Sequence, residues 1–226
     1  MEKYFDLLLK MPLFDRIDRQ ELSSLLGCLQ AKVTEAEKGA PVFLEGDPAG
    51  FIGVVLEGAV QIVRDDYYGT RSVLSLAEPG QLYAEAYACS HLETMPVSGY
   101  ALKQTKIMVL SCRKMLTVCS NACRFHNQLV KNLLQVVAET NIHLSQKIQF
   151  MSQRTTREKL MAYLLDQAKR AGSNEFTIPF DRQALADYLG VERSAMSAEL
   201  SKLRRDGILT TQGSYFLLKG ESPNDF

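Results

Sequence analysis

The chain has 226 residues, and its 26 lysines and arginines balance 26 aspartates and glutamates. This length favours more than one domain, and a net charge of zero means that any affinity for nucleic acid must come from locally placed basic groups. No apolar run approaches the about eighteen residues that cross a bilayer, so no membrane partner is expected. Five cysteines, an odd number, argue against a secreted disulfide framework and predict a cytoplasmic protein.

Residues 1–120 are predicted to form a domain built on an antiparallel β roll. A helical segment over residues 2–29 is followed by short apolar runs that alternate or cluster as strands do, with glycines between them. These runs lie at residues 33, 42–44, 52–56, 60–63, 73–76, 99–102 and 106–110. Such spacing is typical of a small jelly-roll-like structure, and the fold class is therefore α+β.

A long helix is expected next, because residues 121–151 contain no proline or glycine. Seven positions on it repeat with alternating steps of four and three residues, as in a heptad seam: Val130, Leu134, Val137, Asn141, Leu144, Ile148 and Met151. Asn141 falls at an a position, where asparagine pairs with its twin in a parallel two-stranded interface. Residues 121–153 are therefore predicted to be a dimerisation helix and hinge. The alternative is a single helix that packs on its own roll and leaves Asn141 in solvent.

Residues 154–226 are predicted to form a winged helix-turn-helix domain. Polar residues 152–156 form the hinge, Thr155 or Thr156 caps a helix over residues 157–171, and Gly172 ends it. A short strand over residues 175–179 leads into the motif. Two β runs around a Gln-Gly-Ser turn, within residues 208–218, supply the wing.

The helix-turn-helix itself is predicted from Asp181 as a helix cap and from Gly190 as the turn residue. The first helix should bury Ala184, Leu185 and Leu189. The second helix should bury Val191, Ala195, Met196, Leu200 and Leu203. Its outward residues are then Arg193, Ser194, Ser197 and Ala198. Basic side chains gather on the motif, as expected for a DNA-binding surface: Arg182, Arg193, Lys202, Arg204 and Arg205.

A glycine-punctuated roll, a long dimer helix and a winged helix, in that order, resemble the Crp/Fnr family of bacterial transcription regulators. The resemblance covers nearly the whole chain. It is carried by Gly46-Asp47, Leu56-Glu57-Gly58, the run from Pro79 to Glu85, Ser98, and the run from Leu189 to Ser194. It implies a homodimer that binds a pseudo-palindromic site in double-stranded promoter DNA and works with RNA polymerase. It also implies that residues 1–120 are an effector-sensing domain, in which a small molecule bound in the roll shifts the dimer helices and so reorients the two winged helices.

DNA recognition is expected to rest on the second helix of the motif. Arg193 is predicted to form a bidentate contact with guanine, while Ser194 and Ser197 make shorter contacts. Arg182 and Gln183 are expected at phosphates, and Ser214 is expected to reach DNA from the wing turn. The glutamate and arginine that the family commonly uses as readers correspond to Ser194 and Ala198 here, so the operator should differ from the common family consensus.

The expected effector pocket comprises Tyr83, Ala84, Glu85, Tyr87, Val97, Ser98 and Ile142. In the cyclic-nucleotide members that this chain resembles, a glutamate contacts the ribose and an Arg-Ser pair holds the phosphate. Glu85 and Ser98 match that pattern, but Val97 stands in place of the arginine. Valine cannot replace the charge-assisted bidentate bonds of a guanidinium, so cyclic AMP is not expected to bind and the effector is unknown.

No cofactor or metal is predicted. An iron–sulfur cluster would need several N-terminal cysteines, and Cys28 is alone there. Cys89 or His91 could serve as a haem ligand, although one Cys-Ser-His run does not define a haem site. Cys119 and Cys123 could sense oxidants, with Cys112 near in sequence, or could simply pack.

Two other classes of protein compete with the regulator. A metal-dependent cupin enzyme would need clustered histidines, and the chain has only His91, His126 and His143. No nucleophile elbow, P-loop or dinucleotide fingerprint occurs, so no enzyme activity is expected. The other alternative is a ligand- or redox-sensing signalling adaptor that acts through protein partners and not through DNA.

Overall fold

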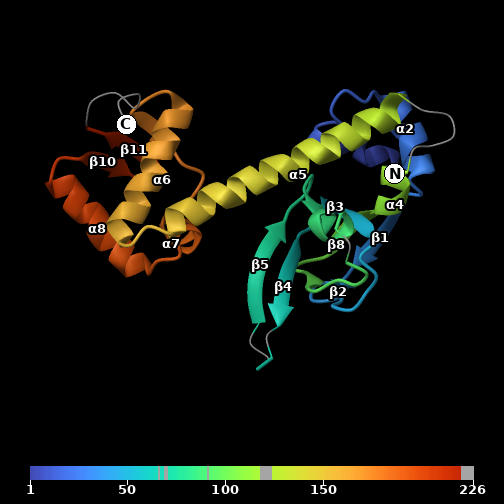
Figure 1. The fold of residues 1–226 in the computed structure, drawn as a ribbon, viewed down its shortest axis with the longest axis horizontal. Helices are drawn as coiled ribbons and strands as arrows, with labels where there is room; N and C mark the ends of the chain where they lie inside the picture. The colour runs from blue at the N-terminus through green and yellow to red at the C-terminus, as the bar shows by residue number, and fades with distance from the viewer. Residues whose placement is uncertain (66, 69–70, 91, 118–123, 220–226) are drawn as a thin grey trace. The chain divides into compact units, whose positions relative to one another are not determined.

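The computed structural model describes residues 1–65, 67–68, 71–90, 92–117 and 124–219 (Figure 1). The chain divides into two compact units, Met1–Glu139 and Thr140–Phe226, and each is described by itself. The division falls inside the long helix α5 (Arg124–Met151). Within the described residues, no helix combines the length and apolarity that crossing a membrane requires.

The N-terminal helical segment is present, but it is interrupted. It consists of the 3-10 helices η1 (Glu2–Tyr4) and η2 (Pro12–Phe14) and the α-helices α1 (Phe5–Leu8) and α2 (Arg19–Cys28). Pro12 explains one break, because proline has no backbone N–H and cannot continue a preceding helix. Asp18 explains the new start at α2, since its carboxylate accepts hydrogen bonds from the backbone of Gln20 and Glu21.

The predicted antiparallel roll is confirmed as two four-stranded sheets. One sheet has the order β1-β8-β3-β6 and the other β2-β7-β4-β5, with every pair antiparallel. The strands are β1 (Lys32–Ala36), β2 (Pro41–Phe43), β3 (Phe51–Glu57), β4 (Val60–Asp65), β5 (Arg71–Ala77), β6 (Leu82–Tyr83), β7 (Ser98–Ala101) and β8 (Thr105–Ser111).

Strand β3 joins the two cores of the first unit because alternate residues point to opposite faces of a strand. Ile52 and Val54 pack with the N-terminal helices and with Leu129 and Leu133 of α5. Val55 instead packs between the sheets, in a core that also includes Phe43, Val60, Ile62, Tyr83, Val97 and Ile107.

Two short helices interrupt the strands and were not predicted. Helix α3 (Glu85–Ala88) follows β6, and α4 (Cys112–Leu116) follows β8. Helices this short contain little more than one turn, so no apolar periodicity can identify them. Ala84, with φ of 66°, makes the left-handed turn into α3.

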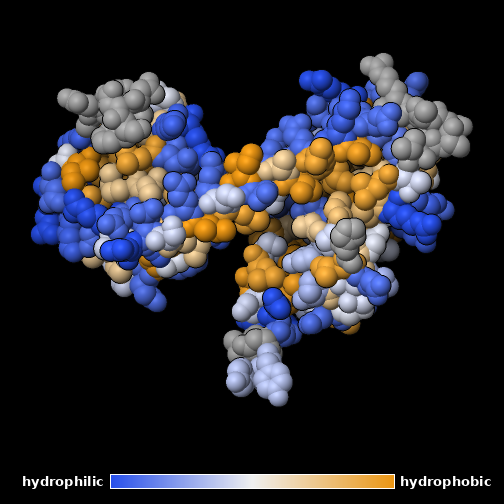
Figure 2. Space-filling view, viewed as in Figure 1, coloured by the Kyte–Doolittle hydropathy of each residue, from blue (hydrophilic) through white to orange (hydrophobic). Residues whose placement is uncertain are grey.

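Helix α5 corresponds to the predicted dimerisation helix, with residues 121–123 outside the described part of the chain. One face packs on the N-terminal helices, where Asn132 donates hydrogen bonds to the backbone oxygens of Leu13 and Asp15. Five of the seven seam residues lie open on this helix, including Leu134 at 70% and Ile148 at 67% exposure, whereas Val130 and Val137 are half-buried and Val137 packs against the core of the first unit. Apolar surface along α5 is visible in Figure 2.

The second unit contains the predicted winged helix-turn-helix together with the last part of α5, from which Phe150 joins its core. The elements of the winged helix-turn-helix are α6 (Thr156–Ala171), β9 (Glu175–Thr177), α7 (Arg182–Leu189), α8 (Arg193–Arg205), β10 (Leu209–Gln212) and β11 (Tyr215–Leu218). The three strands form an antiparallel sheet in the order β10-β11-β9. Thr155 caps α6 and Gly172 ends it in the left-handed conformation, as the sequence predicts.

Candidate nucleic-acid interface and effector pocket

Two local features shape the helix-turn-helix: the cap at the start of α7 and the glycine at its end. Asp181 accepts a hydrogen bond of 2.8 Å from the backbone N–H of Ala184, which caps α7. Gly190 ends the helix at φ of 61°, a conformation that costs other residues free energy because of their Cβ atom. A side chain at position 190 would also lie 2.9 Å from the Cε atom of Met151. The geometry of the motif therefore depends on glycine here.

The first two turns of α8 carry short outward side chains and one arginine. Arg193, Ser194 and Ala198 are exposed and Ser197 is half-buried. The prediction that Ala195 is buried was wrong: it is exposed, because the inner row of the helix runs through Met196, Leu200 and Leu203. On α7, Ala184 is only half-buried, while Ala186 is fully buried.

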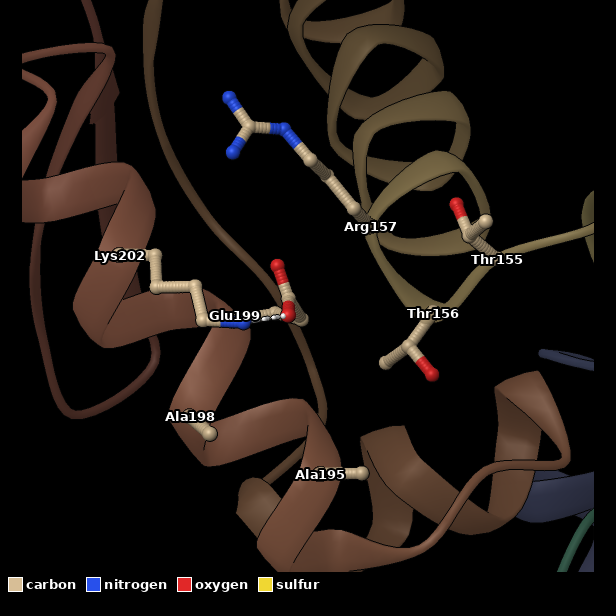
Figure 3. A pocket seen from close by; sticks show the side chains of 7 residues that line it. All are labelled: Thr155, Thr156, Arg157, Ala195, Ala198, Glu199 and Lys202. Atoms are coloured by element: carbon tan, nitrogen blue, oxygen red, sulfur yellow. Dashed lines mark hydrogen bonds and ion pairs between the residues drawn. The ribbon is translucent and has the colours of Figure 1, made fainter.

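A hollow of about 530 Å³ separates the start of α6 from α8 (Figure 3). Its lining residues are Thr155, Thr156, Arg157, Ala195, Ala198, Glu199 and Lys202. The Lys202 ammonium lies 2.6 Å from the Glu199 carboxylate, and Arg157 pairs with Asp206 at 3.2 Å. Ala195 and Ala198 contribute only methyl groups to its lining on α8. The sequence gives no sign that residues 155–157 border α8, because this proximity is a tertiary one.

Three predicted DNA contacts have partners within the domain. The Arg182 guanidinium donates to Thr211 Oγ1 at 2.7 Å and lies 5.0 Å from the centre of the Phe216 ring. Burial lowers the pKa of Arg182, with a smaller effect from Arg204. The hydroxyl of Ser214 donates to the backbone oxygen of Phe180. Gln183, which is exposed, donates to Asp187 on the same helix.

The expected effector pocket contains residues of two kinds, and the first kind belongs to the core between the sheets. Tyr83, Ala84 and Val97 are 3%, 7% and 2% exposed. The Tyr83 ring stacks on Phe43, with 5.9 Å between ring centres. Burial raises the pKa of the Tyr83 hydroxyl, and this group has no hydrogen-bond partner among the described residues.

The remaining expected pocket residues lie nearer the surface. Glu85 and Tyr87 are half-buried on α3, and Ile142 is 57% exposed on the part of α5 that belongs to the second unit. Ser98, also half-buried, accepts a hydrogen bond of 2.9 Å from the backbone N–H of Glu45. The structure thus brings Ser98 to the loop that contains Gly46-Asp47, where it holds protein backbone.

Because Val97 supplies no positive charge, a phosphate bound in the roll would need another basic side chain nearby. Arg71 contacts both carboxylate oxygens of Asp65, with 2.9 Å from Nε to Oδ1 and 2.9 Å from Nη2 to Oδ2. Its guanidinium also lies 4.8 Å from the centre of the Tyr100 ring. Arg71 is therefore already neutralised by a carboxylate on the neighbouring part of the same hairpin.

The cysteines that the sequence offers for haem or redox chemistry are only partly within the described residues. His91, Cys119 and Cys123 lie outside them. Cys28 and Cys89 are exposed and Cys112 is buried. Over the part of the chain that the structure describes, no three histidine, cysteine, aspartate or glutamate side chains group as a metal site.

In comparison with known proteins, each of the two units matches the model of a known domain family. The model of the Crp-like helix-turn-helix domain matches residues 158–221, and the model of the cyclic nucleotide-binding domain matches residues 33–122. The transcriptional activator protein anr of Pseudomonas aeruginosa is 20% identical over 182 residues, which are 78% of this chain and 72% of that protein. FnrL of Cereibacter sphaeroides is 23% identical over 214 residues, 88% of this chain and 79% of that protein.

A solved structure has the same fold. The c-di-GMP responsive regulator CLP of Xanthomonas campestris superposes with a TM-score of 0.56 at 20% identity, covering 90% of this chain and 100% of that one. The two domain matches and this fold define a DNA-binding transcription regulator with an N-terminal domain of the cyclic nucleotide-binding type. The chain belongs to the Crp/Fnr family.

Proposed function

We propose that this regulator acts as a homodimer on a pseudo-palindromic promoter site and responds to an effector other than a cyclic nucleotide. The observation that carries the dimer is the open seam of α5. Leu134, Leu144 and Ile148 are 70%, 55% and 67% exposed along one helix. Large apolar side chains that recur in heptad steps bury themselves favourably against a second copy of the same helix.

Asn141, exposed among these apolar residues, would fix the register of the paired helices. Asparagine at such a position lowers stability but specifies a parallel dimer, since the two amides can hydrogen-bond to each other. A parallel dimer presents two copies of α8 related by a two-fold axis, and this symmetry requires an operator with two inverted half-sites.

Within each half-site, Arg193 is proposed to read guanine, because it lies exposed at the first turn of α8. Ser194 and Ser197 offer hydroxyls of shorter reach. Ala195 and Ala198 line the hollow on α8 and offer methyl groups, which suit the methyl group of thymine. The absence of long side chains at Ser194 and Ala198 supports an operator that differs from the common consensus.

Cyclic nucleotides are a poor match for the roll. Buried Val97 offers no charge, the Ser98 hydroxyl holds the backbone of Glu45, and Arg71 is paired with Asp65. A phosphate placed there would lose water without gaining a guanidinium. The effector is therefore proposed to be a different small molecule. RNA polymerase is the proposed protein partner, and the cytoplasm, where promoter DNA lies, is the proposed location.

Light scattering of the purified chain tests the dimer at micromolar concentration. We expect the mass of two chains, and Ile148→Asp should shift the mass toward one chain, because it places two carboxylates in the seam. The matched control is Gln149→Asp, which adds the same charge at an exposed b position of the same helix, away from the seam. A wild-type monomer would refute the proposal. Asn141→Leu should keep the association but loosen its register.

A further inference from the structure

We propose that Cys89 and Cys112 form a redox-active thiol pair that a peroxide converts into an intramolecular disulfide. Their sulfur atoms lie 3.9 Å apart, although the residues are 23 positions apart in the sequence. Both residues belong to the first unit, so this inference does not depend on the proposed dimer or on DNA binding.

The two cysteines are held opposite each other by the backbone. Cys89 ends α3, and its N–H donates to the backbone oxygen of Glu85 at 2.9 Å. Cys112 begins α4, and its N–H donates to the backbone oxygen of Gly50 at 3.0 Å. Both helices pack against β3. A disulfide needs its sulfur atoms about 2 Å apart, so closure must bring the two sulfur atoms about 2 Å nearer to each other.

The two thiols differ in exposure, so we assign the reaction with peroxide to Cys89 and the disulfide-forming step to Cys112. Cys89 is exposed, whereas Cys112 is 2% exposed. The Cys89 thiolate attacks one oxygen of hydrogen peroxide; the O–O bond breaks, hydroxide leaves, and a sulfenic acid remains. The Cys112 sulfur then attacks the Cys89 sulfur. The S–S bond forms, the S–O bond breaks, and the departing hydroxide takes the Cys112 proton as water. Two thiols are oxidised and one peroxide is reduced to two waters.

The surroundings of the pair set the rate of the first step. Cys89 is exposed as a residue, but partial burial of its thiol beside Cys112 raises its pKa; the contact with Cys112 opposes this shift, and the carboxylate of Glu85 adds to it. Burial raises the pKa of Cys112 to about 12. Because the thiolate is the nucleophile, the reaction should be slow at neutral pH and should accelerate as the pH rises. A disulfide of this kind in a reducing compartment is transient, and small thiols would reverse it.

The test uses the full-length chain with Cys28, Cys119 and Cys123 changed to serine, which leaves only the pair. After treatment with hydrogen peroxide, mass spectrometry of the proteolytic peptides should show one cross-link, between Cys89 and Cys112, that dithiothreitol removes. The matched control adds Cys112→Ala, which should lose the cross-link and let Cys89 proceed to the sulfinic acid. Glu85→Gln should speed alkylation of Cys89 by iodoacetamide, because it removes a carboxylate that raises the pKa of this thiol.

If the triple variant does not fold, the same mapping is done on the wild-type chain over a series of peroxide concentrations. The Cys89–Cys112 peptide should then be the first cross-link to form. Oxidation of Cys89 without that cross-link, or an earlier cross-link between other cysteines, would overturn the proposal.

Discussion

The ring of Tyr83 occupies the space that a side chain at Gly53 would need. The two residues are paired across β3 and β6, and a Cβ atom at position 53 would lie 1.9 Å from the Cζ atom of Tyr83. The ring cannot move aside easily, because it is 3% exposed and stacked on Phe43. The packing between the two sheets of the roll therefore depends on the missing side chain of Gly53.

Gly53→Ala is expected to destabilise the first unit by about 1–3 kcal/mol, the usual cost of overpacking a core. The matched control is Gly27→Ala in α2, where nothing lies within 4 Å of the new methyl group. That change should be neutral or should stabilise the protein, because alanine has a higher helix propensity than glycine. Urea unfolding followed by tyrosine fluorescence measures both. Equal stability of the two variants would contradict this account of the roll.

A capping box between Thr155 and Glu158 begins α6, and its contribution to stability should depend on pH. Thr155 Oγ1 accepts from the backbone N–H of Glu158 at 3.1 Å, and the Glu158 carboxylate accepts from the N–H of Thr155 at 3.0 Å. Thr155→Ala should therefore lower the free energy of unfolding of the second unit by about 1 kcal/mol. Thr156→Ala, next along the chain, removes no cap and is the matched control.

The hydrogen bonds from the Thr155 backbone and side chain lower the pKa of Glu158 below its usual value of 4.5. A carboxyl group with a lowered pKa in the folded state stabilises the protein above its unfolded pKa. This contribution disappears as the pH falls through the folded pKa. Thermal unfolding should thus show a loss of stability below about pH 4.5 that is smaller in Glu158→Gln. The same pH profile in both proteins would contradict the capping role.

Local signals in the sequence predicted the caps and turns correctly, because their chemistry lies within a few residues. Asp181, Gly190 and Thr155 each do what the sequence predicts. Contacts between distant segments could not be predicted. The exposure of Ala195 follows from how α8 turns toward its neighbours, and no spacing in the sequence brings Cys89 to Cys112.

On the candidate DNA surface too, local features were predicted correctly and long-range contacts were not. Arg193 is exposed, as the helical period predicts, whereas Arg182 packs on Phe216 of the wing. A basic residue at the start of α7 suggested a phosphate contact, but the sequence could not reveal an aromatic ring on a strand more than thirty positions later.

Cyclic AMP and cyclic GMP are expected not to bind. Val97 is 2% exposed within the core, and the Ser98 hydroxyl is engaged by the backbone of Glu45. Calorimetric titration should therefore give no heat of binding. Neither nucleotide should raise the unfolding temperature, since a ligand stabilises a protein only by binding its folded state. A dissociation constant in the micromolar range for either one would contradict this view of the roll.

Arg193→Ala is expected to reduce discrimination between operator and random DNA by about 1–3 kcal/mol. Arg205→Ala, at the other end of α8 and also exposed, should leave that discrimination unchanged. The measurement is the ratio of dissociation constants for the two duplexes at one salt concentration. If Arg193→Ala weakens both duplexes equally, Arg193 contacts only phosphate.

Selection of bound duplexes from a random pool by the full-length chain tests the central claim most directly. Because the proposed dimer presents two copies of α8, the enriched sequence should be a pseudo-palindrome. Its half-site centres should lie about 10 base pairs, one helical turn, apart. Arg193→Ala should remove the preference for one guanine in each half. Enrichment of a single half-site, or no enrichment over the starting pool, would contradict a dimeric sequence-specific regulator.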